Sequence, residues 1–397
     1  MATVTPLWGS EGVSGDAVCS LLEVNDDRIL LDCGLSSHLS KSDLKKRLLA
    51  LKGADGRGLD AVIISHADVQ HIGALPLLFK LLGPVQVICT LPILKMGQMV
   101  LYDLYLNRAM EGHERSANGE EEDDGGELFT LDDVDGALED TITVRYNQTV
   151  PVPNAARGQA GTHTLLCGFP AGRTIGGTVW SFKYAAGEIV YAMDVSLSKS
   201  MVLNALPLNK IPLSPSVLLM EGSHSQSSSN GLKGNKPAAF DAKELVQEVM
   251  RTLRNEGNVL IPCESAAKTL DIIKVLGDEW ERNNLGVYHL VFLSHMAYNV
   301  LEFARSQLEW MSDDMSAAFY NNNQKKRNPL YFSLLKTAYS VSQLDAMRGP
   351  KVTRTRTLTL TLALTSTRTQ GGACYRQLSG LRPVQGVAAP LGRRPQV

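Results

Sequence analysis

The sequence predicts a two-part α/β protein. Short apolar segments of strand length alternate with segments of helical period along most of the chain. The 397 residues leave room for two or three domains, and a composition of 44% hydrophobic and 20% charged residues is typical of chains that bury a core. No run approaches the roughly 18 apolar residues that a membrane span needs, and the N-terminus lacks a secretory signal pattern. We therefore expect an intracellular protein with no membrane segment.

The first third of the chain indicates a hairpin followed by alternating helices and strands. Residues 17–24 and 28–32 are β-branched or leucine-rich runs on either side of an Asn-Asp-Asp turn. The next expected elements are a helix at 41–51, a buried strand at 59–65, a helix at 73–82, a strand at 85–90 and a helix at 93–108. The strand ending at Ser65 runs directly into His66 and Asp68, which makes this strand end the first candidate for a functional site.

The middle of the chain contains an acidic loop and a group of three strands. Residues 110–127 lose the apolar period and include the run from Glu120 to Asp124, so we expect a solvated surface loop. Strands are expected at 165–169, 178–184 and 188–193, with three glycines in the first connection. We place residues 1–215, including the acidic loop, in one domain.

A second unit is expected from residue 216 to residue 352. A strand at 217–220 precedes a helix whose apolar stripe is Leu245, Val249 and Leu253. A strand at 258–263, a helix after Ser265 and a strand at 287–293 follow with short links. Strands and helices that alternate in this way imply a parallel α/β layer.

The last segment, residues 353–397, differs in kind. It contains seven Arg and no acidic residue, with Thr-Arg and Thr-Leu repeats followed by a Gly, Ala and Pro-rich stretch. Two interpretations are open: a basic arm that contacts phosphates, or a segment from a frame-shifted or intron-derived gene model, which we favour. Neither predicts a fold here. The preceding residues carry 32 basic against 41 acidic side chains, so they lack the positive field of an ordinary nucleic-acid binder.

The most informative stretch follows the buried strand that ends at Ser65. It resembles the signature H-x-H-x-D-H of the metallo-β-lactamase fold, in which imidazoles and carboxylates on one strand-to-helix loop hold two metal ions. Here the four positions read His66, Asp68, Gln70 and His71. A carboxylate can still coordinate a metal, but the neutral amide of Gln70 is a poor zinc ligand. The resemblance therefore implies a weakened site.

Two further positions of this resemblance lie downstream. Arg173 stands where the family has a histidine ligand, and a guanidinium has no lone pair to give to a metal. Asp194, at the end of a Tyr-Ala-Met-Asp run, matches the bridging aspartate, and Asp32 in Leu-Asp-Cys-Gly matches a structural position of the fold. We expect no bound metal. Our hypothesis is that Arg173 pairs with Asp194 or Asp68 and supplies the positive charge that zinc supplies in active relatives.

Several longer blocks are very similar to one branch of the metallo-β-lactamase/β-CASP proteins, the family of subunit 2 of the cleavage and polyadenylation specificity factor. The blocks are 95–99, 102–105, 128–135, 257–261 and 306–313, and the resemblance covers residues 1–352. It implies a metallo-β-lactamase αββα sandwich with an inserted β-CASP α/β domain at 216–352. Glu221 matches the acidic position at the start of that domain. The strands that return from the insertion in the family are missing from the pattern, so we expect an incomplete sandwich.

By the same resemblance we expect a non-catalytic scaffold, without a cofactor, in nuclear pre-mRNA 3'-end cleavage and polyadenylation. The implied partners are the catalytic endonuclease subunit of the same complex, a symplekin-like scaffold and pre-mRNA. Three alternatives stay open. They are a zinc-dependent endoribonuclease with a degraded site, a small-molecule hydrolase of the same fold, and a truncated product with no role of its own.

Overall fold

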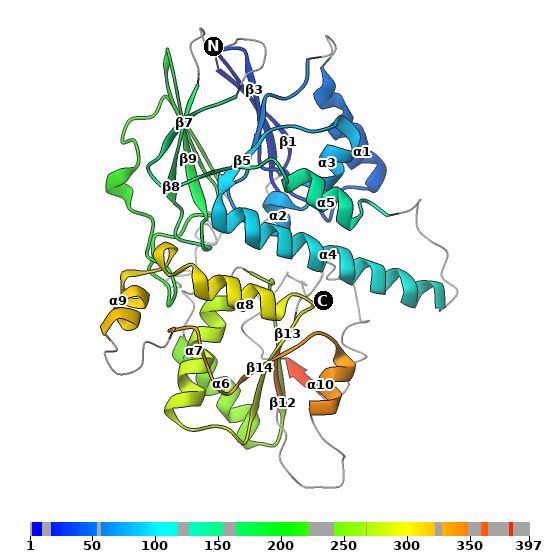
Figure 1. Cartoon of the computed structure of the whole chain (residues 1–397), viewed down its shortest axis with the longest axis vertical. Helices are drawn as coiled ribbons and strands as arrows, with labels where there is room; N and C mark the ends of the chain where they lie inside the picture. The colour runs from blue at the N-terminus through cyan, green and yellow to red at the C-terminus, as the bar shows by residue number, and fades with distance from the viewer. Residues whose placement is uncertain are drawn as a thin grey trace, which may run out of the picture. The chain divides into compact units, whose positions relative to one another are not determined.

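The structure is a computed structural model that describes residues 2–9, 17–53, 57–117, 127–153, 164–221, 242–266, 268–321, 328–347, 359–363 and 381–383. It divides into two compact units (Figure 1). The first unit comprises Met1–Lys233 and Gln307–Ser316, and the second comprises Gly234–Ser306 and Ala317–Val397. Within the described ranges, no helix combines the length and the apolar character needed to cross a bilayer.

The first unit is built on two sheets. In sheet order, the first sheet contains β1 (Ala2–Trp8), β2 (Cys19–Val24), β3 (Asp27–Leu31), β4 (Ala61–Ile63), β5 (Val87–Thr90) and β6 (Ile142–Val144). The second contains β11 (Val217–Met220), β10 (Gly187–Ala192), β9 (Thr178–Tyr184), β8 (Leu165–Pro170) and β7 (Thr149–Pro151). Pairing is antiparallel from β1 to β3 and from β7 to β10, and parallel from β3 to β6 and between β10 and β11.

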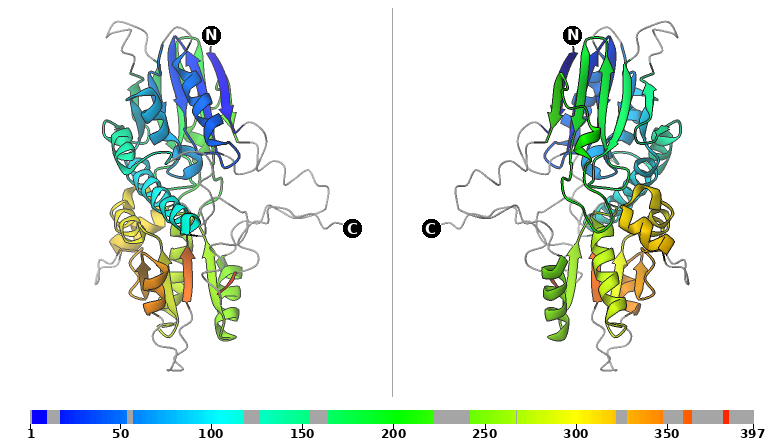
Figure 2. Two further views of the ribbon diagram at one scale, coloured as in Figure 1. Left: turned by 90° about the vertical axis from the view of Figure 1, so that its right-hand side faces the viewer. Right: turned by 90° about the vertical axis from the view of Figure 1, so that its left-hand side faces the viewer.

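The two sheets share one hydrophobic core, and the right-hand view of Figure 2 shows the second sheet, in green, lying over the first, in blue. Trp180 and Phe182 of β9 belong to the same buried cluster as Leu22 and Ile63 of the first sheet. The Trp180 indole N–H also donates to the carbonyl oxygen of Ile64 at 3.1 Å, which ties the second sheet to the loop that follows β4. Because strands bury every second side chain on one face, two facing sheets close a core between them. The sheets thereby fix the loop after β4 in place.

The helices of the first unit include α1 (Lys41–Leu49), α2 (Val69–Ile72), α3 (Leu75–Leu82), α4 (Leu91–Ala117) and α5 (Leu131–Leu138). Figure 1 shows α1, α3 and α5 on the side of the first sheet that faces away from the second sheet. The helix expected at 93–108 is longer, because the Glu, Arg and Ala residues before Ala117 are good helix formers. The acidic loop therefore does not begin at residue 110, and residues 118–126 lie outside the described ranges.

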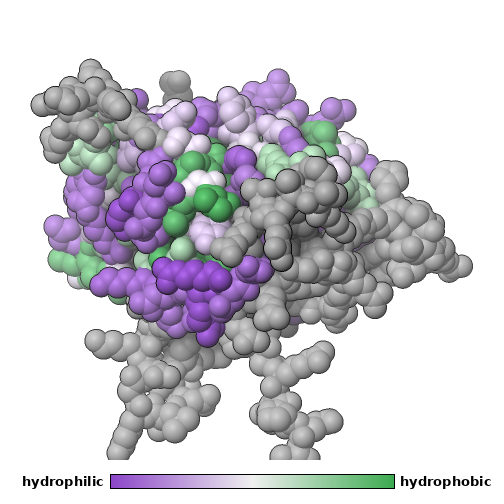
Figure 3. Space-filling model, turned by 90° about the horizontal axis from the view of Figure 1, so that it is seen from below, coloured by the Kyte–Doolittle hydropathy of each residue, from purple (hydrophilic) through white to green (hydrophobic). Residues whose placement is uncertain are grey.

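The second unit contains a parallel five-stranded sheet, as the alternation of strands and helices predicts. Its strands are, in sheet order, β14 (Leu335–Ala338), β13 (His289–Leu293), β15 (Thr359–Ala363), β12 (Asn258–Pro262) and β16 (Leu381–Pro383). The described helices are α6 (Ala242–Arg254), α7 (Thr269–Arg282), α8 (Ala297–Ser306), α9 (Asp313–Asn321) and α10 (Val341–Met347), and the first four residues of α9 belong to the first unit. Helix α6 buries Leu245, Val249 and Leu253, as its stripe predicts. Seen from below, the described surface is largely hydrophilic (Figure 3).

Three features differ from the expected organisation. Strand β11, which we expected to open the second unit, pairs with β10 in the first unit. Residues 307–316 return to the first unit, where the Ser312 amide donates to the Val202 carbonyl at 2.8 Å. Strands β15 and β16 lie in the segment for which we expected no fold, and the Thr-Leu alternation of β15 suits a strand. Strand β11 is an outer strand of its sheet, and the incomplete sandwich that we expected stays a prediction.

Candidate functional site

The short helix α2, which follows the loop after β4, is held in place through its main chain. Three consecutive carbonyl oxygens accept hydrogen bonds from amides of residues 18–35 at 2.8 to 2.9 Å: Val69 from Leu35, Gln70 from Val18 and His71 from Cys33. Gly34 lies so close to α2 that a Cβ atom there would be 1.6 Å from the Gln70 oxygen. Only glycine fits at that position. These contacts fix the main chain of α2 and do not involve the side chain at position 70.

Asp68 is the N-cap of helix α2. Its Oδ1 atom accepts from the amides of Gln70 at 3.0 Å and His71 at 3.1 Å, and the His71 amide also donates to the Asp68 carbonyl at 3.1 Å. The same oxygen lies 2.7 Å from Nδ1 of His71. The Asp68 carboxylate is thus shared between a helix terminus and an imidazole.

Asp68 and His71 form a buried ion pair, with side chains 5% and 4% exposed. Burial disfavours the charged form of both groups, but their mutual attraction and hydrogen bond outweigh it. The result is a lowered pKa for Asp68 and a pKa of about 10 for His71, to which Asp32 and Asp194 also contribute. His71 is therefore protonated at neutral pH. An imidazolium has both ring nitrogens protonated, so it has no lone pair for a metal.

His66 behaves in the opposite way. Its side chain is fully buried, and burial followed by the charge of His71 lowers its pKa to about 3. The Ser65 hydroxyl donates to Asp32 at 2.6 Å, so it accepts from the His66 Nδ1–H at 3.0 Å. This tautomer leaves the lone pair on Nε2. Among the described residues, that atom has no hydrogen-bond partner.

Asp32 connects three strand ends beneath this loop. Its carboxylate accepts from the Ser65 amide at 2.7 Å, from the Ser65 hydroxyl and from the Tyr191 hydroxyl at 2.7 Å. Burial raises the pKa of Asp32, against the lowering effect of His71 and of these hydrogen bonds. Its φ of 56° is a left-handed conformation that aspartate tolerates better than most residues. The position has a structural part in the fold, and sequence reasoning missed Ser65, whose hydroxyl lies between Asp32 and His66.

Arg173 and Asp194 form the other half of the site. The guanidinium Nε lies 2.9 Å from Oδ1 and 3.0 Å from Oδ2 of Asp194. The Arg173 side chain is 35% exposed and that of Asp194 is 14% exposed. Gly172, before the arginine, has a φ of 77°, and a Cβ atom there would lie within 3.0 Å of three backbone atoms. Of the two partners that the sequence left open for Arg173, the structure shows Asp194.

These groups lie close enough to influence one another. The charge of Arg173 contributes to the lowered pKa of His66. The negative charge of Asp194 acts in the upward direction on the pKa values of both His71 and Asp68, although the net shift of Asp68 is downward. The His66 and His71 ring centroids are 4.8 Å apart. The folded chain therefore brings the five charged or imidazole positions of the resemblance together.

The donor set does not fit a divalent metal ion. Asp68 is held by His71 and the helix terminus, Asp194 is held by a guanidinium, and His71 carries a proton. One neutral imidazole nitrogen, that of His66, is left with a lone pair, whereas zinc sites use three or four such donors. In the described part of the chain, no three His, Cys, Asp or Glu side chains form a group that could hold an ion.

The geometry of the loop and sheets agrees with a match found along the sequence. Residues 21–223 match the metallo-beta-lactamase superfamily domain. The chain belongs to this superfamily. The fold class expected from the sequence is confirmed, and the correspondence of the His66 loop to a metal loop of the superfamily stays a prediction.

Three curated relatives carry more specific names. A fruit fly protein (Drosophila melanogaster), "Probable cleavage and polyadenylation specificity factor subunit 2", is 34% identical over 84% of this chain and 41% of its own length. A nematode protein of the same name (Caenorhabditis elegans) is 33% identical over 84% of this chain and 36% of its own. The rice protein "Cleavage and polyadenylation specificity factor subunit 2" (Oryza sativa subsp. japonica) is 31% identical over 80% of this chain and 39% of its own length. The chain thus spans about two fifths of the length of these relatives.

Two further expected positions, Gln70 and Glu221, border this charge cluster. Gln70 contacts its surroundings through its main chain, as described above, and its side chain is half-buried on α2. Glu221 directly follows β11, and its charge contributes to the raised pKa of Tyr191, after burial and Asp32.

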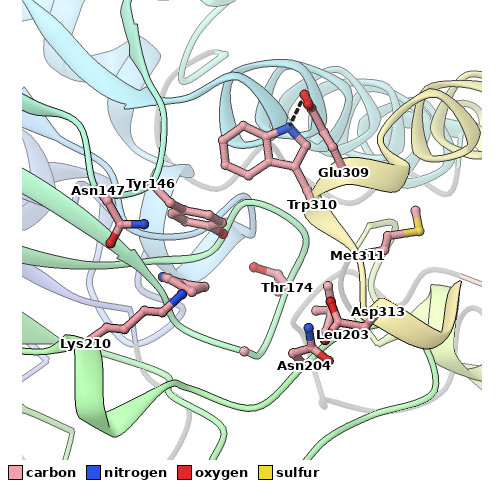
Figure 4. Close-up of a pocket in the computed structure, with 12 residues that line it drawn as sticks. Tyr146, Asn147, Thr174, Leu203, Asn204, Lys210, Glu309, Trp310, Met311 and Asp313 are labelled. Atoms are coloured by element: carbon pink, nitrogen blue, oxygen red, sulfur yellow. Dashed lines mark hydrogen bonds between the residues drawn. The ribbon is translucent and has the colours of Figure 1, made fainter. Parts of the chain in front are cut away.

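A separate pocket of the first unit was missed by sequence reasoning. Its volume is about 250 Å³, and it is lined by Tyr146, Asn147, Pro170, Gly172, Thr174, Leu203, Asn204, Lys210, Glu309, Trp310, Met311 and Asp313 (Figure 4). The walls come from the loop before β7, the loop after β8, residues 203–210 and the returning segment 309–313. The block 306–313 supported the family resemblance, but nothing in its spacing indicated that it meets residues so far away in the chain.

Proposed function

We propose that this chain is a non-catalytic scaffold subunit of the cleavage and polyadenylation specificity factor, acting in the nucleus in pre-mRNA 3'-end cleavage and polyadenylation. The relatives that carry the name of subunit 2 support this proposal, with identities of 31 to 34% over most of the chain. We assign the second unit, with its parallel sheet, to a β-CASP insertion by the same resemblance.

The observation that carries the non-catalytic assignment is the ion pair between Arg173 and Asp194. Hydrolysis in this superfamily uses a metal to generate hydroxide from bound water and to stabilise negative charge. A permanent cation on the bridging aspartate repels a metal from the position where it would bind. In the other half, Asp68 is held by His71 and by the amides at the start of α2. The engagement of both carboxylates by groups of the protein supports the non-catalytic assignment.

The first experiment measures metal content and RNA cleavage with the same purified full-length chain. We expect substoichiometric zinc after dialysis and no cleavage of a labelled RNA that contains a polyadenylation signal. Cleavage that is abolished both by a chelator and by His66→Ala would favour the alternative, a zinc-dependent endoribonuclease. Near-stoichiometric zinc that survives dialysis would contradict the non-catalytic assignment.

The second experiment tests the scaffold role. We propose that the partners are the catalytic endonuclease subunit and a symplekin-like protein, with pre-mRNA bound by the assembly. The tagged full-length chain is expressed in cells and captured from nuclear extract, with the tagged second unit alone as the comparison. Recovery of the endonuclease subunit with the full chain is the expected result, and its absence from repeated captures contradicts the proposed complex.

A further inference from the structure

The pocket between Tyr146 and Trp310 presents two aromatic rings whose polar tips are already bonded. The Tyr146 hydroxyl donates to the Gly177 carbonyl at 2.9 Å, and the Trp310 indole N–H donates to Glu309 at 3.2 Å. The rings meet edge to face, with centroids 4.7 Å apart and planes at 65°. Figure 4 shows both beside the cavity. These side chains therefore offer ring surface, and not hydrogen-bond donors, to a ligand.

A buried hydroxyl in the same pocket has no partner. Thr174 lines the cavity, is 6% exposed, and its Oγ1 atom makes no hydrogen bond to any described residue. A buried polar group without a partner is destabilising, by more than a typical hydrogen bond contributes. Figure 4 shows the Thr174 side chain directed into the space between Lys210 and Trp310. The pocket thus contains an unused hydrogen-bonding group that a ligand can satisfy.

The charges that face the pocket include one anion and one cation. Asp313 brings a carboxylate and Lys210 an ammonium, while the Glu309 carboxylate is turned to the indole N–H of Trp310, away from the cavity (Figure 4). Asp313 begins helix α9 and is exposed, and Figure 4 shows it across the cavity from Lys210. A cation can therefore pair with Asp313, whereas a phosphate group would meet a single ammonium. Nucleic-acid sites show a clear positive excess, because phosphate contacts require several Lys or Arg side chains.

We infer that this pocket binds an arginine side chain from a protein partner. A guanidinium stacks on an aromatic face, donates up to five hydrogen bonds and pairs with carboxylates in a fixed planar geometry. Trp310 provides the face, while Asp313 and Thr174 provide the acceptors. The volume of about 250 Å³ is below the 300 to 1,000 Å³ or so of drug-sized ligand sites and suits one long side chain. This inference does not depend on the proposed function, since it uses none of the residues of the His66 loop.

The test is binding of small probes to the full-length chain, followed by ligand-observed NMR and tryptophan fluorescence. N-acetyl-arginine amide is compared with N-acetyl-citrulline amide, which has the same shape and no charge, and with adenosine and cytidine 5'-monophosphates. We expect binding of the arginine probe at millimolar concentration, with the citrulline probe about ten-fold weaker. Binding of a nucleotide in preference to the arginine probe, or no arginine binding at about 10 mM, overturns the inference.

Three variants locate the site. Asp313→Asn is expected to weaken arginine binding about ten-fold, and Asp132→Asn, an exposed aspartate in the first turn of α5, serves as the matched control with unchanged binding. Thr174→Val removes the buried hydroxyl with little change of shape. If Thr174 is only structural, this variant is as stable as the parent or more stable and binds equally well. A several-fold loss of arginine affinity in a stable Thr174→Val variant supports the site, and unchanged affinity in both Asp313→Asn and Thr174→Val contradicts it.

Discussion

The charge cluster has two halves, the Asp68–His71 pair and the Arg173–Asp194 pair, which neutralise their carboxylates in different ways. In the His66 loop, Asp68 is paired with a fully buried imidazolium, that of His71. In the other half, Asp194 is paired with Arg173, which is 35% exposed. An imidazolium can lose its proton within the accessible pH range, whereas a guanidinium cannot. The first half should therefore contribute more to stability and depend on pH, and the second should contribute less and be indifferent to pH.

The largest effect is expected from breaking the buried pair. Asp68→Ala removes the partner of a buried cation and the cap of α2 together, so we expect the free energy of unfolding to fall by about 3 to 5 kcal/mol. Urea denaturation of the full chain, followed by the fluorescence of the buried Trp180, measures it. Asp68→Asn keeps a capping oxygen without the charge, so its free energy of unfolding should lie between those of the parent and Asp68→Ala. A cost below about 1 kcal/mol for Asp68→Ala would mean that the pair is not charged in the folded protein.

The second effect is a dependence of the free energy of unfolding on pH. The pKa of His71 is raised from 6.5 to about 10, so its contribution is complete below pH 6.5 and is lost as the pH rises through 10. The lowered pKa of Asp68 has the opposite sense: its contribution is present above pH 3.8 and is lost as the pH falls through the lowered value. Between pH 7 and pH 10 we expect a loss of about 3 to 4 kcal/mol relative to His71→Gln. If the free energy of unfolding changes with pH in the same way in the parent and in His71→Gln, the assignment of this pH dependence to His71 is wrong.

The third prediction rebuilds the metal ligands. The double variant Gln70→Asp, Arg173→His releases Asp194 and places a carboxylate and an imidazole at the two positions where this chain departs most from the family signature. We expect it to bind Zn²⁺ in equilibrium dialysis and to gain about 2.7 kcal/mol of stability at 100 times the dissociation constant. The parent, measured in parallel, should gain none. Equal zinc affinity in the two proteins would show that Arg173 does not keep metal out.

The smallest effect concerns Arg173 alone. Arg173→Met leaves Asp194 unpaired, but both groups are partly exposed and solvent screens their interaction, so we expect a cost of about 1 kcal/mol. The cost should be about the same at pH 7 and pH 10, because a guanidinium is effectively always protonated in proteins. Arg173→Lys is the control that keeps the charge without the planar fork. If the cost of Arg173→Met falls steeply between these pH values, the proposed difference between the two halves is wrong.

Much of the site could be predicted because its residues follow the ends of strands. The run after residue 65 and the run ending at Asp194 each follow a strand, so the approach of Arg173 to Asp194 could be expected from their order in the fold. Periodicity also predicted most strands and helices to within a few residues. The use of Asp68 as a helix cap and ion-pair partner could not be predicted, because a carboxylate in this motif suggests a metal ligand equally well.

The missed features depend on contacts between distant parts of the chain. The return of residues 307–316 to the first unit rests on contacts such as Ser312 with Val202, which leave no periodic trace in either segment. The pocket at Trp310 was missed for the same reason. Strand β15 was missed because arginine-rich repeats surround a stretch whose Thr-Leu alternation is itself typical of a strand.

The main-chain hydrogen bonds around Gln70 have a consequence for how this segment can vary in evolution. The carbonyl oxygens of residues 69–71 and the close approach of Gly34 hold the backbone of α2 through main-chain atoms. Position 70 can therefore accept other side chains at small cost to the fold, whereas any side chain at position 34 would displace this backbone.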